Sequence, residues 1–255
     1  MSVHVEAAVR ALAVIPARWG STRFPGKPLA TLAGRPLVQH VVEAAVNSQA
    51  FERVVVATDD QRIAEAVAGF GGNVERTSSA HRSGTDRVAE VAARLPAEAP
   101  DVVVNLQGDE PLLDPGSLRR LVQAFTDVRV AMATLVRPLV DAAERLNPHV
   151  VKVVPDIRGD ALYFSRADIP YDRDGMRVPR FAHVGLYGYR RATLLRLAQL
   201  PPGTLEQAES LEQLRALEHG IRIRCIVTEH LSIGVDTPAD VVRAEAVLAA
   251  RQGSG

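Results

Sequence analysis

Apolar segments of strand length alternate with amphipathic segments of helical length through the first half of the chain, and this alternation restricts the fold most. A buried strand is expected at 11–15, and further strands are expected at 54–58, 73–76 and 101–106, the one at 73–76 short. Apolar positions spaced three and four apart predict helices at 36–46, 60–70, 86–95 and 115–125. Parallel strands need such crossover helices, so the sequence predicts an α/β fold with a doubly wound, mostly parallel sheet.

The alternation becomes less regular after about residue 136. Further strands are expected at 151–155, 161–166, 183–190 and 221–229. Two more helices are expected, one continuous helix at 205–220 and another at 238–250. We expect a single α/β domain over 1–255, with a nucleotide-binding half at about 11–135 and an elaborated half at about 136–250.

Charge and hydropathy exclude several classes of protein. The 30 basic residues balance the 30 acidic ones, which argues against a general nucleic-acid binder. No apolar run approaches the roughly 18 residues that a membrane span needs, and no secretion signal is evident. The single cysteine, Cys225, excludes an internal disulfide and a multi-cysteine metal cluster. We therefore expect a soluble, cytoplasmic protein without a nucleic-acid or membrane partner.

The loop after the first strand reads "VIPARWGSTRFPGK" and gathers cations and hydroxyls in one short glycine-bearing turn. Its phosphate-binding candidates are Arg18, Ser21, Arg23 and Lys27. Open α/β sheets bind ligands beyond the carboxyl ends of their strands, and such side chains suit phosphate oxygens. The pattern is neither a P-loop nor a dinucleotide fingerprint, and the alternative interpretation is a solvated turn.

Two acidic residues lie where Mg²⁺ could be bound, because Mg²⁺ prefers carboxylate oxygens combined with substrate phosphates. Asp109 follows the fourth expected strand in "NLQGDEP", and Asp236 precedes a helix in "GVDTP". Asp109 could instead be an ordinary turn residue beside Gly108. Asp240 with Thr237 forms the pattern of a helix cap, which leaves Asp236 free for another role.

Nine motifs occur in order between about residues 12 and 248: "IPARWGSTRFPGKPL", "VVATDD", "HRSGTDR", "NLQGDEP", "VKVV", "YFSRADIP", "HVGLYGYR", "LEQLR" and "GVDTP". Together they resemble the 3-deoxy-D-manno-octulosonate (Kdo) cytidylyltransferases, or CMP-Kdo synthetases. The chain departs from that family only in a short N-terminal extension and in a variable segment at about 172–180.

The resemblance implies an enzyme that joins CTP and Kdo to give CMP-Kdo and pyrophosphate, with Mg²⁺, for lipopolysaccharide synthesis. It also implies a fold of the nucleotide-diphospho-sugar transferase type and a homodimer. The second half of the chain would then bind the sugar and form the dimer.

The resemblance assigns a role to each motif residue. The CTP phosphates would be held by Arg18, Ser21, Arg23 and Lys27, and the cytosine by Ser83 and Gly84. Asp109 and Asp236 would hold the metal, and the catalytic set would be Arg18, Lys27, Asp109 and Asp236. The sugar would be bound by Gln107, Arg166, His183, Tyr187, Glu212 and Gln213. Taken individually, several of these residues also fit ordinary core or solvated positions.

Other functions remain compatible with the same motifs. A related CMP-sugar synthetase could act on an amino analogue of Kdo or on a sialic-type nonulosonate. A non-catalytic nucleotide-binding regulator could share the fold, although it would not need both Asp109 and Asp236.

Overall fold

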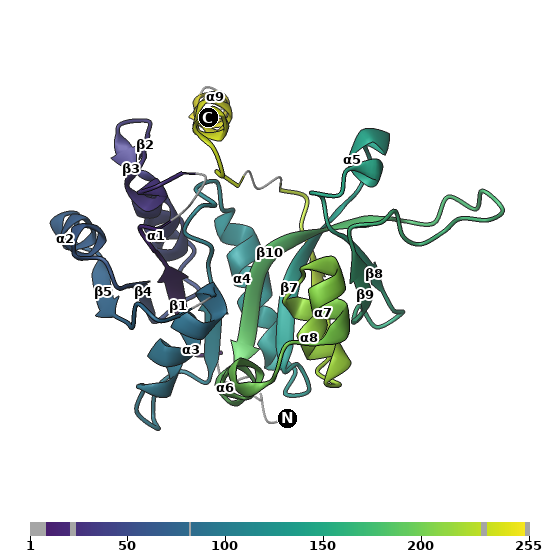
Figure 1. Ribbon diagram of the computed structural model, residues 1–255, viewed down its shortest axis with the longest axis horizontal. Helices are drawn as coiled ribbons and strands as arrows, with labels where there is room; N and C mark the ends of the chain where they lie inside the picture. The colour runs from purple at the N-terminus through teal and green to yellow at the C-terminus, as the bar shows by residue number, and fades with distance from the viewer. Residues whose placement is uncertain (1–8, 21–23, 82, 231–233, 253–255) are drawn as a thin grey trace, which may run out of the picture. The chain divides into compact units, whose positions relative to one another are not determined.

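The computed structural model describes residues 9–20, 24–81, 83–230 and 234–252 (Figure 1). Its contacts divide the chain into two compact units. We call the described residues within 10–119 and 232–255 the flanking unit, and those within 1–9 and 120–231 the central unit. That the whole chain forms a single domain stays a prediction.

The flanking unit is built on a parallel sheet in the order β6-β1-β4-β5. These strands are β1 (Ala11–Pro16), β4 (Arg53–Thr58), β5 (Asn73–Arg76) and β6 (Val102–Asn105). Each was expected from the sequence. β1 and β6 are buried almost throughout, as expected of parallel strands whose faces are covered by helices.

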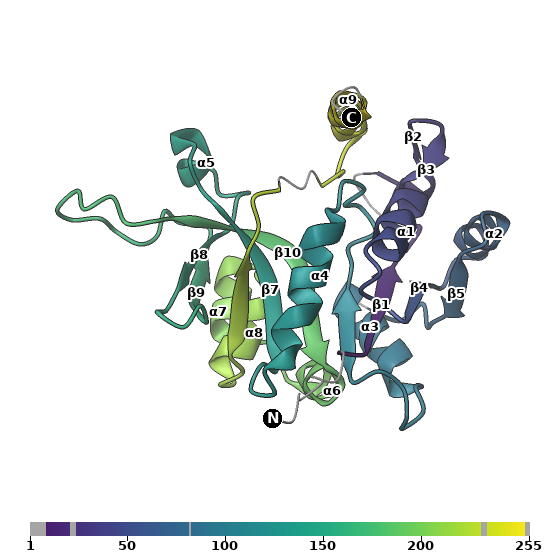
Figure 2. The ribbon, with the colours of Figure 1, turned by 180° about the vertical axis from the view of Figure 1, so that it is seen from behind.

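Helices connect these strands in the expected order. They are α1 (Leu37–Asn47), α2 (Gln61–Gly69), α3 (Gly84–Ala93) and α4 (Pro115–Gln123), the last of which spans the boundary between the units. Along the chain the strands run from β1 to β4 and β5, and α3 then carries the chain back to β6 on the other side of β1. Figures 1 and 2 show α1 and α3 on opposite faces of the sheet. The strand order therefore reverses between β1 and β6, the position at which open α/β sheets bind ligands.

Two helix starts differ from the sequence prediction. The second helix was expected to begin at residue 60, but Asp60 is its cap, and the Asp60 carboxylate accepts from the Arg62 N–H at 2.9 Å. Helix α3 begins at Gly84, two residues before its predicted start. Its first turn forms because Ser83 and Asp86 make a reciprocal capping box, which satisfies N–H groups that a helix start leaves unpaired.

The flanking unit also contains a 3₁₀ turn, a short hairpin and the C-terminal helix. These are η1 (Lys27–Leu29), the strands β2 (Thr31–Leu32) and β3 (Arg35–Pro36), and α9 (Pro238–Gln252). An apolar cluster joins them and consists of Leu32, Leu37, Leu112, Val235 and Ala244. Three chain segments far apart in sequence thus share one small core.

The central unit contains a mixed sheet around β7 (Met132–Pro138). β11 (Ile223–Val227) pairs with β7 in parallel, and β10 (Phe181–Arg190) pairs with it antiparallel. β8 (Lys152–Pro155) continues from β10, and β9 (Ala161–Ser165) pairs with β8, both antiparallel. β7 was missed from sequence, because its run of alanine, methionine and leucine fits a helix as well as a strand.

The helices of the central unit are short. They are α5 (Ala142–Leu146), α6 (Arg191–Gln199), α7 (Thr204–Glu209) and α8 (Gln213–Glu218), with the 3₁₀ turn η2 (Ala124–Thr126). The prediction of one continuous helix at 205–220 was wrong. Ser210 ends α7 in the left-handed region, at φ 52°, so the chain turns before α8 begins.

Candidate functional site

A cavity of about 230 Å³ lies at the carboxyl ends of β1 and β6, where the strand order reverses. All of its lining residues belong to the flanking unit. Among them are the predicted site residues Arg18, Lys27, Ser83, Gly84, Gln107, Asp109 and Asp236. Ser21 and Arg23 lie outside the described residues.

The loop after β1 is closed by contacts between its two ends. The Gly26 N–H donates to the Trp19 carbonyl at 3.0 Å, and the Arg62 guanidinium stacks 3.4 Å from the centre of the Trp19 ring. Gly26 has φ 71°, and a Cβ there would come within 2.9 Å of that ring. Only glycine therefore fits, and the turn delivers Lys27 into the cavity at the start of η1.

Lys27 joins the two acidic residues of the site. Its ammonium Nζ donates to Asp109 Oδ2 at 2.5 Å and to Asp236 Oδ1 at 3.1 Å. The Lys27 side chain is 14% exposed, and those of Asp109 and Asp236 are 31% and 48% exposed. Two carboxylates from segments far apart in the sequence thus converge on one cationic centre.

Backbone contacts fix this convergence. The Val235 N–H donates to the Asp109 carbonyl at 2.8 Å, which ties the segment before α9 to the loop after β6. A Cβ on Gly108 would lie 3.0 Å from the Pro16 carbonyl oxygen, so the same loop packs directly against the end of β1. The Asp240 carboxylate accepts from the Asp236 N–H at 3.0 Å.

The predicted cap at α9 is confirmed with one change in its hydrogen bonds. The Asp240 carboxylate accepts from the Thr237 N–H at 2.8 Å, as expected of a capping residue. The Thr237 hydroxyl donates to the same carboxylate at 2.9 Å. These bonds and the ion pair with Arg243 outweigh the effect of burial and lower the pKa of Asp240 to about 2.

The start of α3 forms another wall of the cavity, contributed by Ser83 and Gly84. The Ser83 hydroxyl oxygen accepts from the Asp86 N–H at 3.1 Å, so its hydrogen can still be donated. The first N–H groups of a helix have no partner inside the helix and carry partial positive charge. This wall can therefore donate hydrogen bonds to carbonyl or phosphate oxygens.

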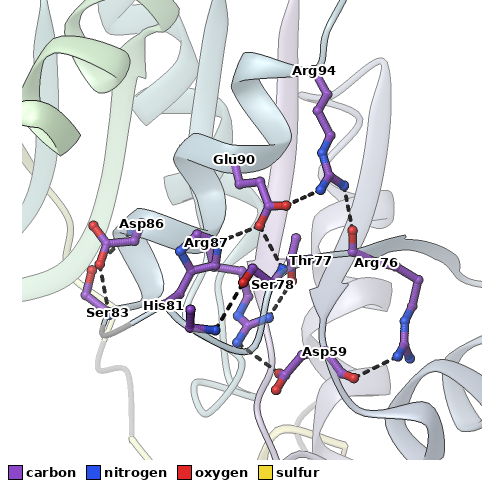
Figure 3. A network of polar contacts seen from close by, with 11 residues as sticks. Asp59, Arg76, Thr77, Ser78, His81, Ser83, Asp86, Arg87, Glu90 and Arg94 are labelled. Carbon is purple, nitrogen blue, oxygen red and sulfur yellow. Dashed lines mark hydrogen bonds and ion pairs between the residues drawn. The ribbon is translucent and has the colours of Figure 1, made fainter.

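An ion pair between Arg87 and Asp59 holds the helix of that wall (Figure 3). Arg87 lines the cavity, is 4% exposed, and donates to the Thr77 hydroxyl. Its Nη2 lies 2.9 Å from Asp59 Oδ1 in an ion pair that lacks hydrogen-bond geometry. Asp59 belongs to the "VVATDD" motif, so that motif holds α3 in place across the end of β4. No separate role was predicted for Arg87, because its partner is remote in the chain.

Arg18 provides a further positive charge on the cavity wall and is exposed. Within the described part of the chain, no group of three or more His, Cys, Asp or Glu side chains gathers as a metal site. The protein would therefore offer a metal ion the two carboxylates of Asp109 and Asp236, with its other ligands coming from water or a bound phosphate. That donor set suits Mg²⁺.

The other predicted sugar residues lie in the central unit. Arg166, just past β9, is held by the connection between α7 and α8. Its Nε donates to the Glu209 carbonyl at 2.7 Å and its Nη2 to the Ser210 carbonyl at 3.3 Å. The Glu209 carboxylate in turn accepts from the Arg166 N–H at 2.9 Å. The Arg166 guanidinium thus contacts neutral carbonyls, and its charge can still attract an anion.

His183 and Tyr187 lie together on β10, with ring centroids 5.3 Å apart. A bulge in the pairing with β7 falls between Val184 and Tyr187. His183 Nε2 is 3.0 Å from the Thr134 hydroxyl, which itself donates to the Leu186 carbonyl at 2.7 Å. Burial lowers the pKa of His183 to about 3, so the ring is neutral near pH 7.

Two buried donors in this group have no hydrogen-bond partner among the described residues: the Tyr187 hydroxyl and Gln213 Nε2. Gln213 is only 7% exposed, which rules out the solvated position considered from sequence. Burial raises the pKa of Tyr187 well above its usual value. Buried polar groups without partners are uncommon, and they indicate a place that a polar ligand could satisfy.

One important residue was missed from sequence. Lys152 is completely buried, and its ammonium donates to the carbonyls of Asn147 at 2.9 Å, Val150 at 2.7 Å and Arg166 at 2.6 Å. It thereby fixes the backbone at Arg166. The "VKVV" motif signalled its presence, but carbonyl partners cannot be deduced from side-chain types.

The geometry defines a class of protein: an α/β protein that binds a phosphorylated ligand at its strand-switch point with cations and paired carboxylates. The cytidylyltransferase family model matches residues 12–223, and the chain belongs to the cytidylyltransferase family. The family resemblance read from the motifs is thereby confirmed.

Individual relatives agree. The chain is 58% identical to the 3-deoxy-manno-octulosonate cytidylyltransferase of Myxococcus xanthus, over 96% of this chain and 98% of the relative. It is 52% identical to that of Geobacter sulfurreducens, over 90% and 95%. A solved CMP:2-keto-3-deoxy-manno-octonic acid synthetase complexed with CTP has a TM-score of 0.90 and 45% identity, covering 95% of this chain and 99% of that one.

These comparisons also confirm the predicted fold class, an α/β fold with a mostly parallel sheet of the nucleotidyltransferase type. A 4-diphosphocytidyl-2C-methyl-D-erythritol synthase from Anaerococcus prevotii shares the fold alone, at 13% identity and a TM-score of 0.64. None of the described helices is both long and apolar enough to span a bilayer.

Proposed function

We propose that this protein transfers CMP from CTP to Kdo, releasing pyrophosphate and giving CMP-Kdo. One observation carries the proposal: Lys27, Asp109 and Asp236 converge in the cavity at the strand-switch point. Membership of the cytidylyltransferase family and the names of the relatives support the choice of nucleotide and sugar.

In the proposed reaction, the anomeric hydroxyl of Kdo attacks the α-phosphorus of CTP. A bond forms between this oxygen and phosphorus, the bond to the bridging oxygen breaks, and pyrophosphate leaves with its electrons. The hydroxyl proton passes to water. For this type of reaction, the protein mainly positions the substrates and neutralises charge.

The residues of the flanking unit divide these tasks. Arg18 and Lys27 neutralise phosphate charge, and the N–H groups at the start of α3 donate to oxygens of the nucleotide. Asp109 and Asp236 hold Mg²⁺, which when bound lowers the pKa of the attacking hydroxyl and offsets developing charge. The carboxylates fit this ion because they already converge on a single cation.

The residues of the central unit bind the sugar acid. The guanidinium of Arg166 takes the Kdo carboxylate, while Tyr187 and Gln213 donate to sugar hydroxyls. The neutral ring of His183 and the carboxylate of Glu212 are assigned to the same ligand. The family resemblance also assigns Gln107 to the sugar, and Gln107 lines the cavity of the flanking unit.

Pyrophosphate release tests the proposal directly. Purified protein is mixed with CTP and Mg²⁺, and then with Kdo, its amino analogue or a sialic-type nonulosonate. We expect fast release with Kdo. Preference for either of the other acids would overturn the sugar assignment, and no release with any acid would favour a non-catalytic nucleotide binder.

The same assay tests the base. UTP replaces the exocyclic amine of cytosine with a carbonyl, and a site that binds the amine rejects such analogues by up to roughly 10⁴-fold. We expect UTP to be a poor substrate, and equal kcat/KM for UTP and CTP would contradict the proposal.

The family resemblance also supports a homodimer that acts in the cytoplasm. Exposed apolar side chains of the central unit could contribute to a dimer interface, among them Val140, Leu146, Tyr171 and Met176. Light scattering during size-exclusion chromatography would give the mass, and a monomer at micromolar concentration would contradict the proposal.

A further inference from the structure

The ammonium of Lys27 lies where a divalent cation would bind. It contacts one oxygen of Asp109 at 2.5 Å and one of Asp236 at 3.1 Å, the carboxylates assigned above to Mg²⁺. Mg²⁺ approaches its oxygen ligands to about 2.0–2.1 Å and tolerates little departure from octahedral geometry. A metal ion and the ammonium therefore cannot share this position, and their charges repel each other.

The two carboxylates are held together by more than Lys27. The Val235 N–H bonds to the Asp109 carbonyl at 2.8 Å, and the Asp240 carboxylate accepts from the Asp236 N–H at 3.0 Å. These bonds hold the backbone of the two acidic residues in place without involving Lys27, so both negative side chains belong to one small region of the cavity wall. Like charges in such proximity destabilise the protein unless a cation offsets them.

The chemistry of the Lys27 side chain allows its ammonium to change partners. Lys27 lies on η1, a 3₁₀ turn of three residues. Its side chain is a flexible four-carbon stem that ends in a compact ammonium, unlike the planar guanidinium of arginine. The chain uses lysine at only two positions and arginine everywhere else. A mobile point charge suits a cation that must change partners.

We propose that Lys27 is an exchangeable counter-ion: it neutralises Asp109 and Asp236 before the metal binds, and a divalent cation displaces its ammonium toward the nucleotide phosphates. This inference rests on the proposed function, because it takes Asp109 and Asp236 as the metal ligands. Nucleotide binding and metal binding then strengthen each other. Bound phosphates attract the ammonium away from the carboxylates, which raises the affinity for the metal. By thermodynamic reciprocity, bound metal raises the affinity for the nucleotide by the same factor.

The exchange makes an unusual prediction for Lys27→Met. Loss of a catalytic cation lowers turnover, yet the metal alone should bind more tightly because its competitor is gone. Mn²⁺ binding to the full chain without nucleotide, followed by the EPR signal of free Mn²⁺, measures this directly. We expect at least roughly tenfold tighter binding in Lys27→Met, which corresponds to about 1.4 kcal/mol.

Controls separate exchange from a general effect of charge. Arg18→Met removes one positive charge from the same cavity without removing the competitor, so we expect a much smaller change in Mn²⁺ affinity. Lys27→Arg retains a competing cation and should bind Mn²⁺ about as weakly as the wild type. Lys27→Gln replaces Lys27→Met if the latter unfolds. Equal or weaker Mn²⁺ binding in the Met or Gln variant would overturn the inference.

The small number of lysines gives a second readout. A chain labelled with ¹³C at lysine Cε gives signals from Lys27 and Lys152 only, and Lys27→Arg assigns them. We expect Mg²⁺ to shift the Lys27 signal and to leave that of Lys152 unchanged, because the Lys152 ammonium is bound to three carbonyls. A stationary Lys27 signal in metal-saturated protein would contradict the exchange.

Asp109→Asn distinguishes failure of the inference from failure of the proposed metal site. Combined with Lys27→Met, it should abolish the tighter Mn²⁺ binding. If Mn²⁺ binding is the same with and without Asp109, the carboxylates do not hold the metal, and the proposed site and the exchange both fail. If binding depends on Asp109 but not on Lys27, the proposed metal site stands and only the exchange fails.

Discussion

The backbone N–H of Val235 donates to the carbonyl of Asp109 at 2.8 Å, joining the segment before α9 to the loop after β6. Val235 is completely buried in the cluster that also contains Leu32 and Leu112. The position of Asp236 is therefore set by a backbone bond on one side and by apolar packing on the other. The site depends on this attachment of α9 to the flanking unit.

Asp236 and Asp240 should separate metal binding from stability. We expect Asp236→Asn to reduce turnover severely and to raise the Mg²⁺ concentration required, with little change in melting temperature. Asp240→Asn should instead cost about 0.5–2 kcal/mol of stability, because it weakens the cap of α9.

Mg²⁺ titrations of activity and thermal melts of both variants provide the measurements. Thr237→Ala removes only the hydroxyl bond to Asp240 and serves as a milder control for the cap. Normal turnover and an unchanged Mg²⁺ requirement in Asp236→Asn would make its carboxylate structural.

The alternation of strands and helices in the flanking unit could be predicted because each element carries its own periodic pattern. The break between α7 and α8 could not, since the apolar spacing continues through Ser210 and only its backbone conformation interrupts the helix. β7 and α6 were missed where propensities do not distinguish strand from helix.

Individual site residues were predictable from charge and from position at strand ends, but their partners were not. Nothing near Lys27 in sequence identifies Asp109 and Asp236 as its partners in an ion pair, because the fold alone brings these segments together. The same holds for Arg87 and Asp59. The partners of Lys152 are harder still to predict, because they are backbone carbonyls, which every residue has.

Stability should fall between pH 6.5 and pH 5 because of His183. Its pKa is about 3 in the folded protein, below the ordinary value of 6.5, so the unfolded chain binds the proton more strongly. The contribution of His183 is complete above pH 6.5 and is lost as the pH falls toward 3. At pH 5 the loss is about 2 kcal/mol, at about 1.4 kcal/mol for each pH unit.

Urea unfolding at several pH values measures how the free energy of unfolding depends on pH. We expect His183→Gln to flatten this dependence between pH 6.5 and 5. His149→Gln, at an exposed histidine, should leave the dependence unchanged. A slope that persists in His183→Gln would assign the pH dependence to another group.

The attraction between the charges of Arg87 and Asp59 should stabilise the folded protein. Arg87→Met leaves a carboxylate with a buried oxygen, Asp59 Oδ1, without its cation. Asp59 is partly exposed, so we expect a loss of about 2 kcal/mol, below the 3–5 kcal/mol typical of fully buried pairs.

A double-mutant cycle with Asp59→Asn isolates the coupling. The double variant should recover part of the loss, because the amide needs no counter-charge. Strictly additive losses in unfolding free energy would show that the two side chains act independently. CTP affinity, measured in parallel, would reveal whether the position of α3 matters for the nucleotide.

Lys152 should be necessary for the order of the segment that carries Arg166. Its ammonium is completely buried, and burial lowers its pKa, but three carbonyl acceptors hold it in place. Lys152→Met preserves much of the apolar stem and removes the donor, leaving the carbonyls of Asn147, Val150 and Arg166 without it. We expect a loss of about 3 kcal/mol in the free energy of unfolding, since each unsatisfied buried polar group costs about 1–3 kcal/mol and relaxation recovers part of it.

The functional consequence should be selective. Lys152 contacts the backbone of Arg166 and not its guanidinium, so it acts on the sugar acid only by positioning that residue. We therefore expect Lys152→Met, assayed at a temperature where it remains folded, to raise the KM for Kdo several-fold with a smaller effect on the KM for CTP. A purely structural role would lower the concentration of active enzyme and leave both KM values unchanged. Equal effects on the two substrates would contradict the positioning role, while a selective effect on Kdo would also support Arg166 as a ligand of the sugar acid.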